Sequence, residues 1–394
     1  EAVGVSVFRQ QLVLGTTRLQ PCESFVSLGL GKSVRLVLVV VRHIPIVTAG
    51  GCSAKIWNAA TGECTTTMSG HRMAILSAAF SSDGTKVLTA SIDGTAKVWN
   101  SLTGECIMTL GEHKGTVRLA VFSPDESTIA TASPTGFAKM FNASTGECTK
   151  TLGAKIGAVD FSPDGCTLLT GSAHGTVAML DIPTGKYANA LGSHIDVVRC
   201  AVFSPDGSMA LTGSLDFTAK LWIVSTGECA KTLAGHEHMI VSVAFSHDGS
   251  MVLSASADAT ARIWSVASGE CTKMLIGHAH SISSVKITRD GSRVLTASSD
   301  ATAKIWSADS GECLMTLAGH VDDVHSAVFS PDESTLITVS FDDTAKIWDA
   351  RTGLCIRTLT GHEQGVRSAA FFVEKSAGLA GDSDSVAPNT APRG

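Results

Sequence analysis

The chain has 394 residues, 44% of them hydrophobic and only 17% charged, which allows a large buried core and excludes disorder throughout. Its net charge of −6 excludes a general binder of nucleic acid or of membrane surfaces, because such proteins need an excess of Lys and Arg. No apolar run reaches the roughly 18 residues that cross a bilayer. The 11 cysteines form no Cys-x-x-Cys pair, so we expect free thiols in a reducing compartment, the cytoplasm or the nucleus.

Residues 1–43 do not follow the repeat that fills most of the chain. The stretch FRQQLVLGTTRLQPCESFVSLGLGKSVRLVLVVV at 8–41 has strand patterns at 12–14 and 36–38, with a turn at 15–19. It resembles the C-terminal half of a ubiquitin-like domain, so we expect a partial ubiquitin-like segment over 1–43. Gly31-Lys32-Ser33 does not indicate a phosphate-binding loop, because Val26 stands where that motif has Gly and a strand pattern follows.

The tryptophans set the period of a repeat. From Trp222 onward they are 42 residues apart, and Trp57 and Trp99 have the same spacing. The 123 residues between Trp99 and Trp222 divide into 42, 39 and 42 if Phe141 and Leu180 take the intermediate places. Eight units therefore follow one another, centred on positions 57, 99, 141, 180, 222, 264, 306 and 348.

The sixth unit shows the pattern within a repeat. Residues 240–245, 251–256, 260–264 and 271–275 have strand patterns, and turn sequences separate them, the first at 246–249. No helix pattern occurs in the unit. A single four-stranded sheet cannot bury both of its faces, whereas sheets packed radially around an axis can. We therefore predict an all-β fold, an eight-bladed β-propeller over residues 44–373, with seven blades as the alternative.

The units resemble WD repeats. Gly-His pairs at 235–236, 277–278 and 319–320 open units, and strings such as VLTASSDATAKIW (294–306) and LITVSFDDTAKIWD (336–349) close them. The resemblance covers residues 44–373 and includes the period, the turns and the Trp position of most units. It implies a WD-repeat β-propeller.

A hydroxyl, a His, an Asp and a Trp recur at fixed offsets in five units. A hydroxyl with His and Asp can form a nucleophilic triad, but one active site does not need five copies. The resemblance implies a structural tetrad, in which the indole N–H donates to the hydroxyl, the hydroxyl to His and His to Asp. The five sets are His71, Thr89, Asp93 and Trp99; His194, Thr212, Asp216 and Trp222; His236, Ser254, Asp258 and Trp264; His278, Thr296, Asp300 and Trp306; and His320, Thr338, Asp342 and Trp348.

Three units depart from this pattern. Unit 1 has Cys52 in place of Asp, and unit 3 has Thr135 and Phe141 in place of Asp and Trp. Unit 4 lacks the Gly-His pair and has His174 and Leu180 at the other two places. We expect apolar packing to hold these three units, and we expect units 5 to 8 to form the more stable arc.

Cysteines also recur once per unit. They begin the predicted fourth strands, too far apart for disulfides, and we expect them to be small buried apolar residues. They are Cys64, Cys106, Cys148, Cys229, Cys271, Cys313 and Cys355.

The chain ends are expected to meet. Unit 1 lacks a first strand, and residues 365–372 match a first strand with no unit after it. Pairing the two would remove an open edge. Residues 34–41 compete for the same place, but they do not match the repeat. The tail at 374–394 is small, polar and Pro-containing, and we expect it to be disordered.

The run Trp348-Asp349-Ala350-Arg351 offers an alternative function. It resembles the WDxR element by which some WD-repeat proteins dock on the adaptor of cullin-RING ubiquitin ligases. Asp349 and Arg351 are the possible docking residues.

The favoured function is that of a non-enzymatic scaffold, because no lone catalytic set appears. We expect protein or peptide partners, a monomeric propeller within a larger complex, and no cofactor, metal, nucleic acid, membrane or small-molecule substrate. Loops on a rigid frame carry function, so we place the binding face on the Gly-His loops and the turns between second and third strands. Its variable positions are Leu215, Phe217, His238, Met239, His280, Asp322, Asp323 and Phe341.

Overall fold

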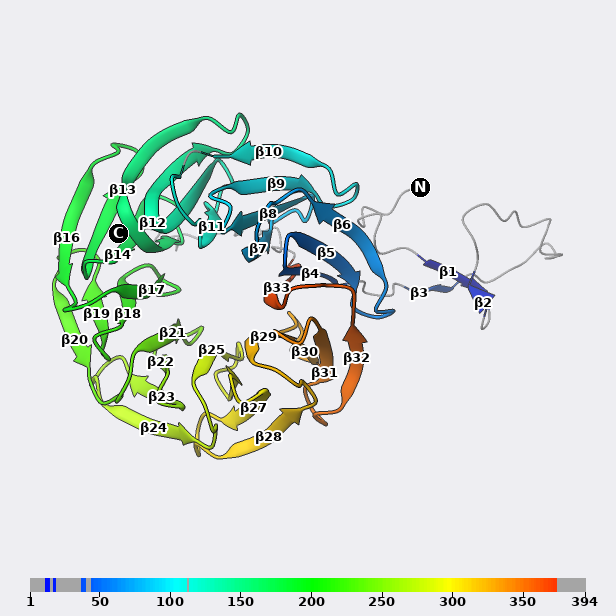
Figure 1. The fold of residues 1–394 in the computed structure, drawn as a ribbon. Coiled ribbons are helices and arrows are strands. Elements are labelled where there is room, and N and C mark those ends of the chain that lie inside the picture. Colours follow the sequence, from blue (N-terminus) through cyan, green and yellow to red (C-terminus); the bar gives the residue numbers. More distant parts are fainter. Residues whose placement is uncertain (1–10, 15–16, 19–36, 40–43, 112, 374–394) are drawn as a thin grey trace, which may run out of the picture.

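A closed ring of β-sheets makes up most of the protein. The computed structural model describes residues 11–14, 17–18, 37–39, 44–111 and 113–373, and every element in these ranges is a strand. The sheets stand side by side around a central axis, with one edge strand of each sheet at the centre and the other at the rim (Figure 1). The predicted all-β propeller class is confirmed.

Five sheets repeat one four-stranded antiparallel pattern. In one of them β21 (Ile240–Phe245), β22 (Met251–Ser256), β23 (Thr260–Ser265) and β24 (Cys271–Ile276) pair in chain order. The strands of the other four are β7 (Ile75–Phe80), β8 (Lys86–Ser91), β9 (Ala96–Asn100) and β10 (Cys106–Leu110); β17 (Val198–Phe203), β18 (Met209–Ser214), β19 (Ala219–Ile223) and β20 (Cys229–Leu233); β25 (Ile282–Ile287), β26 (Arg293–Ser298), β27 (Thr302–Ser307) and β28 (Cys313–Ala318); and β29 (Val324–Phe329), β30 (Thr335–Ser340), β31 (Ala345–Asp349) and β32 (Cys355–Leu359).

Two neighbouring units share one six-stranded sheet. Its strands are β11 (Leu119–Phe122), β12 (Thr128–Asn142), β13 (Cys148–Phe161), β14 (Thr167–Ser172), β15 (Thr176–Asp181) and β16 (Tyr187–Ser193). The expected eight separate sheets are therefore not found here, because β12 and β13 continue through the places where other units have a turn or loop. The Asp that shapes the turn after the second strand in other units is absent, with Thr135 in its place.

The last strand closes the ring by pairing with the first strand of the repeat region. β33 (Val366–Phe371) is antiparallel to β4 (Pro45–Gly50), and β5 (Ser53–Asn58) and β6 (Cys64–Ser69) complete that sheet. The prediction that the C-terminal strand fills this place is confirmed. Of the competing stretch at 34–41, residues 37–39 lie elsewhere, in β3 (Val37–Val39).

The core lies between neighbouring sheets. The second strands are buried on both faces, as in β22, where five of six residues are buried, whereas only three of six are buried in the third strand β23. Trp306 on β27 packs with Leu253 on β22 and Ile263 on β23, which belong to the preceding sheet. Each Trp thus fastens its own sheet to the one before it, and the ring depends on these contacts.

The N-terminal segment is described in three short strands only. β1 (Gln11–Leu14) pairs with β2 (Thr17–Arg18) and with β3, in the order β2-β1-β3. The rest of 1–43 lies outside the described residues, and the ubiquitin-like resemblance is not confirmed. The tail at 374–394, predicted to be disordered, also lies outside them. Over the described ranges, no helix is long and apolar enough to cross a membrane.

Closure predicts a steric requirement at Gly50. Its equivalent in the other units is Ser, but a Cβ here would lie within 2.9 Å of Val366 Cα and closer still to the carbonyl oxygen of Gly365. Gly50→Ala should therefore push β33 away from β4 and lower the free energy of unfolding by about 1–3 kcal/mol, measured by urea denaturation. Gly111→Ala is the control, because nothing lies within 4 Å of a Cβ at that position. Equal effects of the two substitutions would contradict this view of closure.

Candidate functional site: the loop face and the tetrads beneath it

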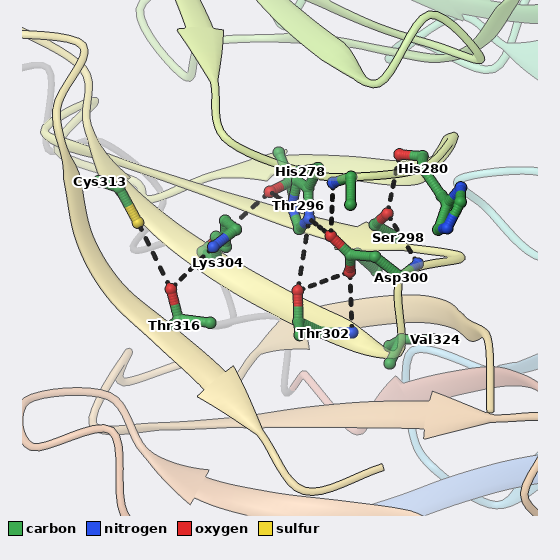
Figure 2. Close-up of polar contacts among 12 residues, drawn as sticks. His278, His280, Thr296, Ser298, Asp300, Thr302, Lys304, Cys313, Thr316 and Val324 are labelled. Carbon is green, nitrogen blue, oxygen red and sulfur yellow. Dashed lines mark hydrogen bonds and ion pairs between the residues drawn. The ribbon is translucent and has the colours of Figure 1, made fainter. Parts of the chain in front are cut away.

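The predicted tetrad residues meet in a continuous hydrogen-bonded chain. The Trp306 indole N–H donates to Thr296 Oγ1 over 2.8 Å. Thr296 Oγ1 in turn lies 2.8 Å from His278 Nε2, and both of these residues are labelled in Figure 2. His278 Nδ1 is 2.7 Å from Asp300 Oδ2. All five predicted sets have this arrangement, with His–Asp distances of 2.7 to 2.9 Å.

Burial fixes the protonation state of the tetrad. Burial lowers the pKa of His278 in spite of the opposing hydrogen bond and charge of Asp300, so the imidazole is neutral. Its Nδ1–H then donates to Asp300, and Nε2 accepts from the Thr296 hydroxyl. Burial alone raises the pKa of Asp300, but hydrogen bonds from Thr302, the Ala279 N–H and His278 outweigh it and hold the pKa at about 2.

The carboxylate of each tetrad also holds two loops in place. Asp300 Oδ2 accepts the N–H of Ala279, directly after the Gly-His pair, and Oδ1 accepts the N–H of Thr302 beyond the turn (Figure 2). Arg72, Ile195, Glu237 and Val321 donate in the same way to the Asp of their own units. The tetrads therefore connect the buried core to one face of the ring. Because Thr296 is fully buried, its hydroxyl cannot meet a substrate.

One further tetrad is incomplete, and its residues come from the two ends of the repeat region. Trp57 Nε1 donates to Thr48 Oγ1 over 2.7 Å, and Thr48 Oγ1 is 2.8 Å from His362 Nε2. No hydrogen-bond partner of His362 Nδ1 is found in the described part of the chain, and Cys52 stands where Asp is expected. Sequence reasoning missed His362 as a member, although the Gly361-His362 pair was the available signal.

Units 3 and 4 satisfy their threonines by another route. Thr131 Oγ1 donates to the carbonyl of Lys139, and Thr170 Oγ1 donates to that of Ala178. Without an indole N–H at position 141 or 180, these hydroxyls turn to the backbone of the paired strand. A cavity of about 330 Å³ lies in unit 4, and its lining includes Thr170, His174 and Tyr187.

The expectation that the repeated cysteines are buried is wrong. All seven are exposed and reduced. They begin the outermost strand, which is covered on one face only, so that in β28 Leu317 alone is buried. Cys313 Sγ lies 3.8 Å from Thr316 Oγ1, which accepts a hydrogen bond from Lys304 Nζ (Figure 2).

The predicted binding-face residues all lie in the two loop types that the tetrads hold together. The turn residues Leu215 and Phe341 donate backbone N–H groups to the carbonyls of Val197 and Asp323 in the preceding loops. Phe217 stacks on His238 of the next unit, with ring centroids 5.6 Å apart. The other predicted residues are in the preceding loops of their units: His280 and Asp322 are exposed, and Met239 and Asp323 are half-buried.

The structure adds three exposed apolar residues to this face. Met73, Ile195 and Val321 follow the recurrent His of their units in the same loops, and Ile195 is 96% exposed. Sequence reasoning did not include them in the binding face. Their backbone contact with the tetrad Asp turns the side chains of Ile195 and Val321 outward.

Phe217 has a backbone conformation that is regular for its turn position but unusual for a bulky residue. Its φ is +71°, at a turn position that Gly94 occupies in unit 2 and Ala259 in unit 6. A bulky side chain at positive φ is strained, and such strain gathers at functional positions. Phe217 is also 41% exposed, so core packing does not explain it.

The WDxR residues have a local structural role. Asp349 Oδ1 accepts the N–H groups of Arg351 and Thr352 and so closes the turn after β31. Asn100 and Asn142 close the matching turns of units 2 and 3 in the same way. The Arg351 side chain is exposed. Within the described ranges, no group of three or more His, Cys, Asp or Glu could hold a metal ion.

Comparisons with known proteins point to one family. The family model described as "WD domain, G-beta repeat" matches seven segments, at 62–100, 104–142, 146–181, 185–222, 227–265, 269–307 and 311–349. The crystal structure of the computationally designed Ika8 protein is similar, with a TM-score of 0.69 and 28% identity over 77% of this chain and 92% of that one. No curated protein matches.

The tetrad geometry predicts the effect of removing its carboxylate. Asp300→Ala leaves His278 Nδ1 and two backbone N–H groups without their acceptor, so the free energy of unfolding should fall by about 2–4 kcal/mol in urea denaturation. The exposed Asp309→Ala is the control. If Asp300→Ala unfolds at the same urea concentration as this control, the tetrad does not stabilise the ring.

The tetrad that spans the chain ends predicts a loss of stability in acid. Burial, reinforced by the charge of Lys55, lowers the pKa of His362 from 6.5 to about 4. Between these values the unfolded chain binds more protons at His362 than the folded chain does, so the free energy of unfolding falls as the pH falls from 6.5 to 4. His362→Gln should flatten this slope by up to about 1.4 kcal/mol per pH unit. Urea titrations across this range test it, with the exposed His247→Gln as control; parallel slopes for both would contradict it.

Proposed function

The chain belongs to the WD-repeat family, and from this premise we propose that it is a non-enzymatic scaffold which captures a protein or peptide partner on the loop face. The loop face consists of the loops that follow the Gly-His pairs and the turns after the second strands. Proteins of this family generally mediate protein–protein interactions. The described residues offer no competing catalytic set, because the only recurrent hydroxyl–His–Asp sets are buried.

The conformation of Phe217 is the observation that carries this proposal. A half-exposed aromatic ring is held at positive φ and stacked on His238 across the boundary between two units. Aromatic side chains are favoured anchors in protein interfaces. Ile195 lies in the loop that the Asp216 of the same unit holds, so two exposed apolar side chains of unit 5 belong to one face. An exposed apolar group of this kind favours protein contact over a solvated role.

We infer that eight units form the scaffold. Each of the seven family matches begins at a fourth strand and ends at the third strand of the next unit. The eighth such segment would consist of β32 and β33 from one end of the repeat region and β4 and β5 from the other. It is not continuous in the sequence and therefore cannot match as one segment. Division of β12 at its turn and of β13 at residue 153 turns the six-stranded sheet into two sets of four. Eight buried apolar clusters around the ring also support this count.

Docking on a ubiquitin-ligase adaptor through Asp349 and Arg351 stays a prediction. The turn-closing role of Asp349 is shared by Asn100 and Asn142 and so does not single out this position. The proposal also includes three further points. The propeller over 44–373 acts as one domain, it is located in the cytoplasm or the nucleus, and it is monomeric within a larger complex.

The loop face predicts a selective loss of partners. The double substitution Ile195→Ser with Phe217→Ser removes two exposed apolar side chains without touching a tetrad side chain. Leu354→Ser with Ile356→Ser removes two of similar size from the rim, where they are 69% and 43% exposed. Affinity purification with mass spectrometry should show partners that the loop-face variant loses and the rim variant keeps. Identical partner sets, with both variants folded, would contradict the proposed face.

A further inference from the structure

The innermost strands carry one equivalent residue per unit around the axis of the ring. In seven of these strands that residue forms a one-residue β-bulge, as Arg199 does between Val198 and Cys200. The bulge lets it depart from the alternation of the strand. The eight equivalent residues, hereafter the inner ring, are Leu76, Arg118, Gly157, Arg199, Val241, Ser283, His325 and Arg367.

Three residues of the inner ring are arginines: Arg118, Arg199 and Arg367. Arg118 Nη1 donates to the carbonyl oxygen of Arg199, two units away, over 2.9 Å, and lies 3.4 Å from that of Gly157. The charges of Arg118, Arg199 and Arg367 all act on His325, which belongs to yet another unit. β11, β17, β29 and β33 are the innermost strands of their sheets and surround the centre of the ring (Figure 1), so side chains of units 3, 5 and 8 and of the closing strand can interact there although they are far apart in the chain.

Among the described residues, no carboxylate forms an ion pair with these arginines. The ion pairs found there are those between His and Asp of the tetrads. Arg199 Nε and Arg367 Nε are buried and have no hydrogen-bond partner there. Each such donor would gain from an acceptor, since an unpaired buried donor is costly.

The surroundings favour a bound anion, and not a carboxylate side chain of the protein, as the partner of these arginines. The Arg367 guanidinium lies 4.9 Å from the centroid of the Phe341 ring, which also contacts the His325 ring. Burial, with the charges of the three arginines, lowers the pKa of His325 to about 4. Asp323 acts on His325 in the opposite sense. Asp160, a carboxylate further along β13, is already engaged with the Phe203 N–H.

We propose that Arg118, Arg199 and Arg367 form a binding site for a phosphate group in the central opening of the propeller. Guanidinium groups present paired donors that match the oxygens of phosphate, and three of them can neutralise a dianion. The ligand is either free inorganic phosphate or a phosphate group carried on a peptide. The site goes beyond the partner face proposed above and does not use Ile195 or Phe217.

Arg199→Gln with Arg367→Gln tests the site. Arg118 is kept because it also bonds backbone carbonyls. Inorganic phosphate, compared with chloride at equal ionic strength, should raise the midpoint of thermal unfolding of the native chain in a saturable way. The double variant should bind phosphate at least about tenfold more weakly. Arg289→Gln with Arg351→Gln, which removes two exposed arginines, should respond as the native chain does.

Two further measurements separate the outcomes. A Gly-Ser-phosphoserine-Gly-Ser peptide and its unphosphorylated form distinguish the sources of the ligand: tighter binding of the phosphopeptide than of inorganic phosphate assigns the site to peptides, and equal or weaker binding assigns it to the free anion. Arg199→Lys keeps the charge but loses the paired donors, so it should weaken phosphate binding several-fold even if the double variant is unstable. A native chain with no saturable response, or one with the same response in the double variant, overturns the site while leaving the partner face untouched.

Discussion

No sheet of this protein can cover its own two faces, and the whole architecture follows from that constraint. Each sheet is buried on both sides by its neighbours, with Trp306, for example, packed into the sheet before its own. A row of such sheets leaves two open faces unless its ends meet. The pairing of β33 with β4 makes them meet, and it is the one sheet that is built from both ends of the repeat region. The stability of the ring therefore depends on its closure.

The tetrads carry this rigidity from the core to the surface. Each Asp accepts from a buried His on one side and from backbone N–H groups of two loops on the other. The loops are consequently held by the same hydrogen bonds that satisfy the interior, and little conformational entropy remains to be lost when a partner binds. In unit 3, where Thr135 takes the place of the Asp, the second and third strands run on as β12, and β13 joins units 3 and 4 without the loop that follows the fourth strand elsewhere.

The repeat made the fold, the closure and the tetrads predictable, because periodic residues report periodic contacts. The Trp spacing gave the position of each sheet, and the unmatched strand at 365–372 identified the closing partner of β4. The errors arose where burial was predicted from the residue type alone, without regard to whether the strand lies inside the ring or at its rim. Cys313 was expected in the core on the strength of its residue type, yet it lies on the half-covered rim. His362 and the inner arginines could not be assigned, since only closure brings residues so distant in sequence together.

In such a ring, we expect functional residues at positions that have the same backbone conformation from unit to unit but carry different side chains. The turn position after the tetrad Asp has positive φ in several units, yet it carries Gly94, Ala259 and Phe217 in different units. The inner bulge position is equally regular and carries Val241, Ser283 or Arg367. Symmetry fixes where these side chains point, and the departures from symmetry decide what they can bind. The three arginines of the inner ring are such a departure in a chain of net negative charge, and the proposed phosphate site depends on them.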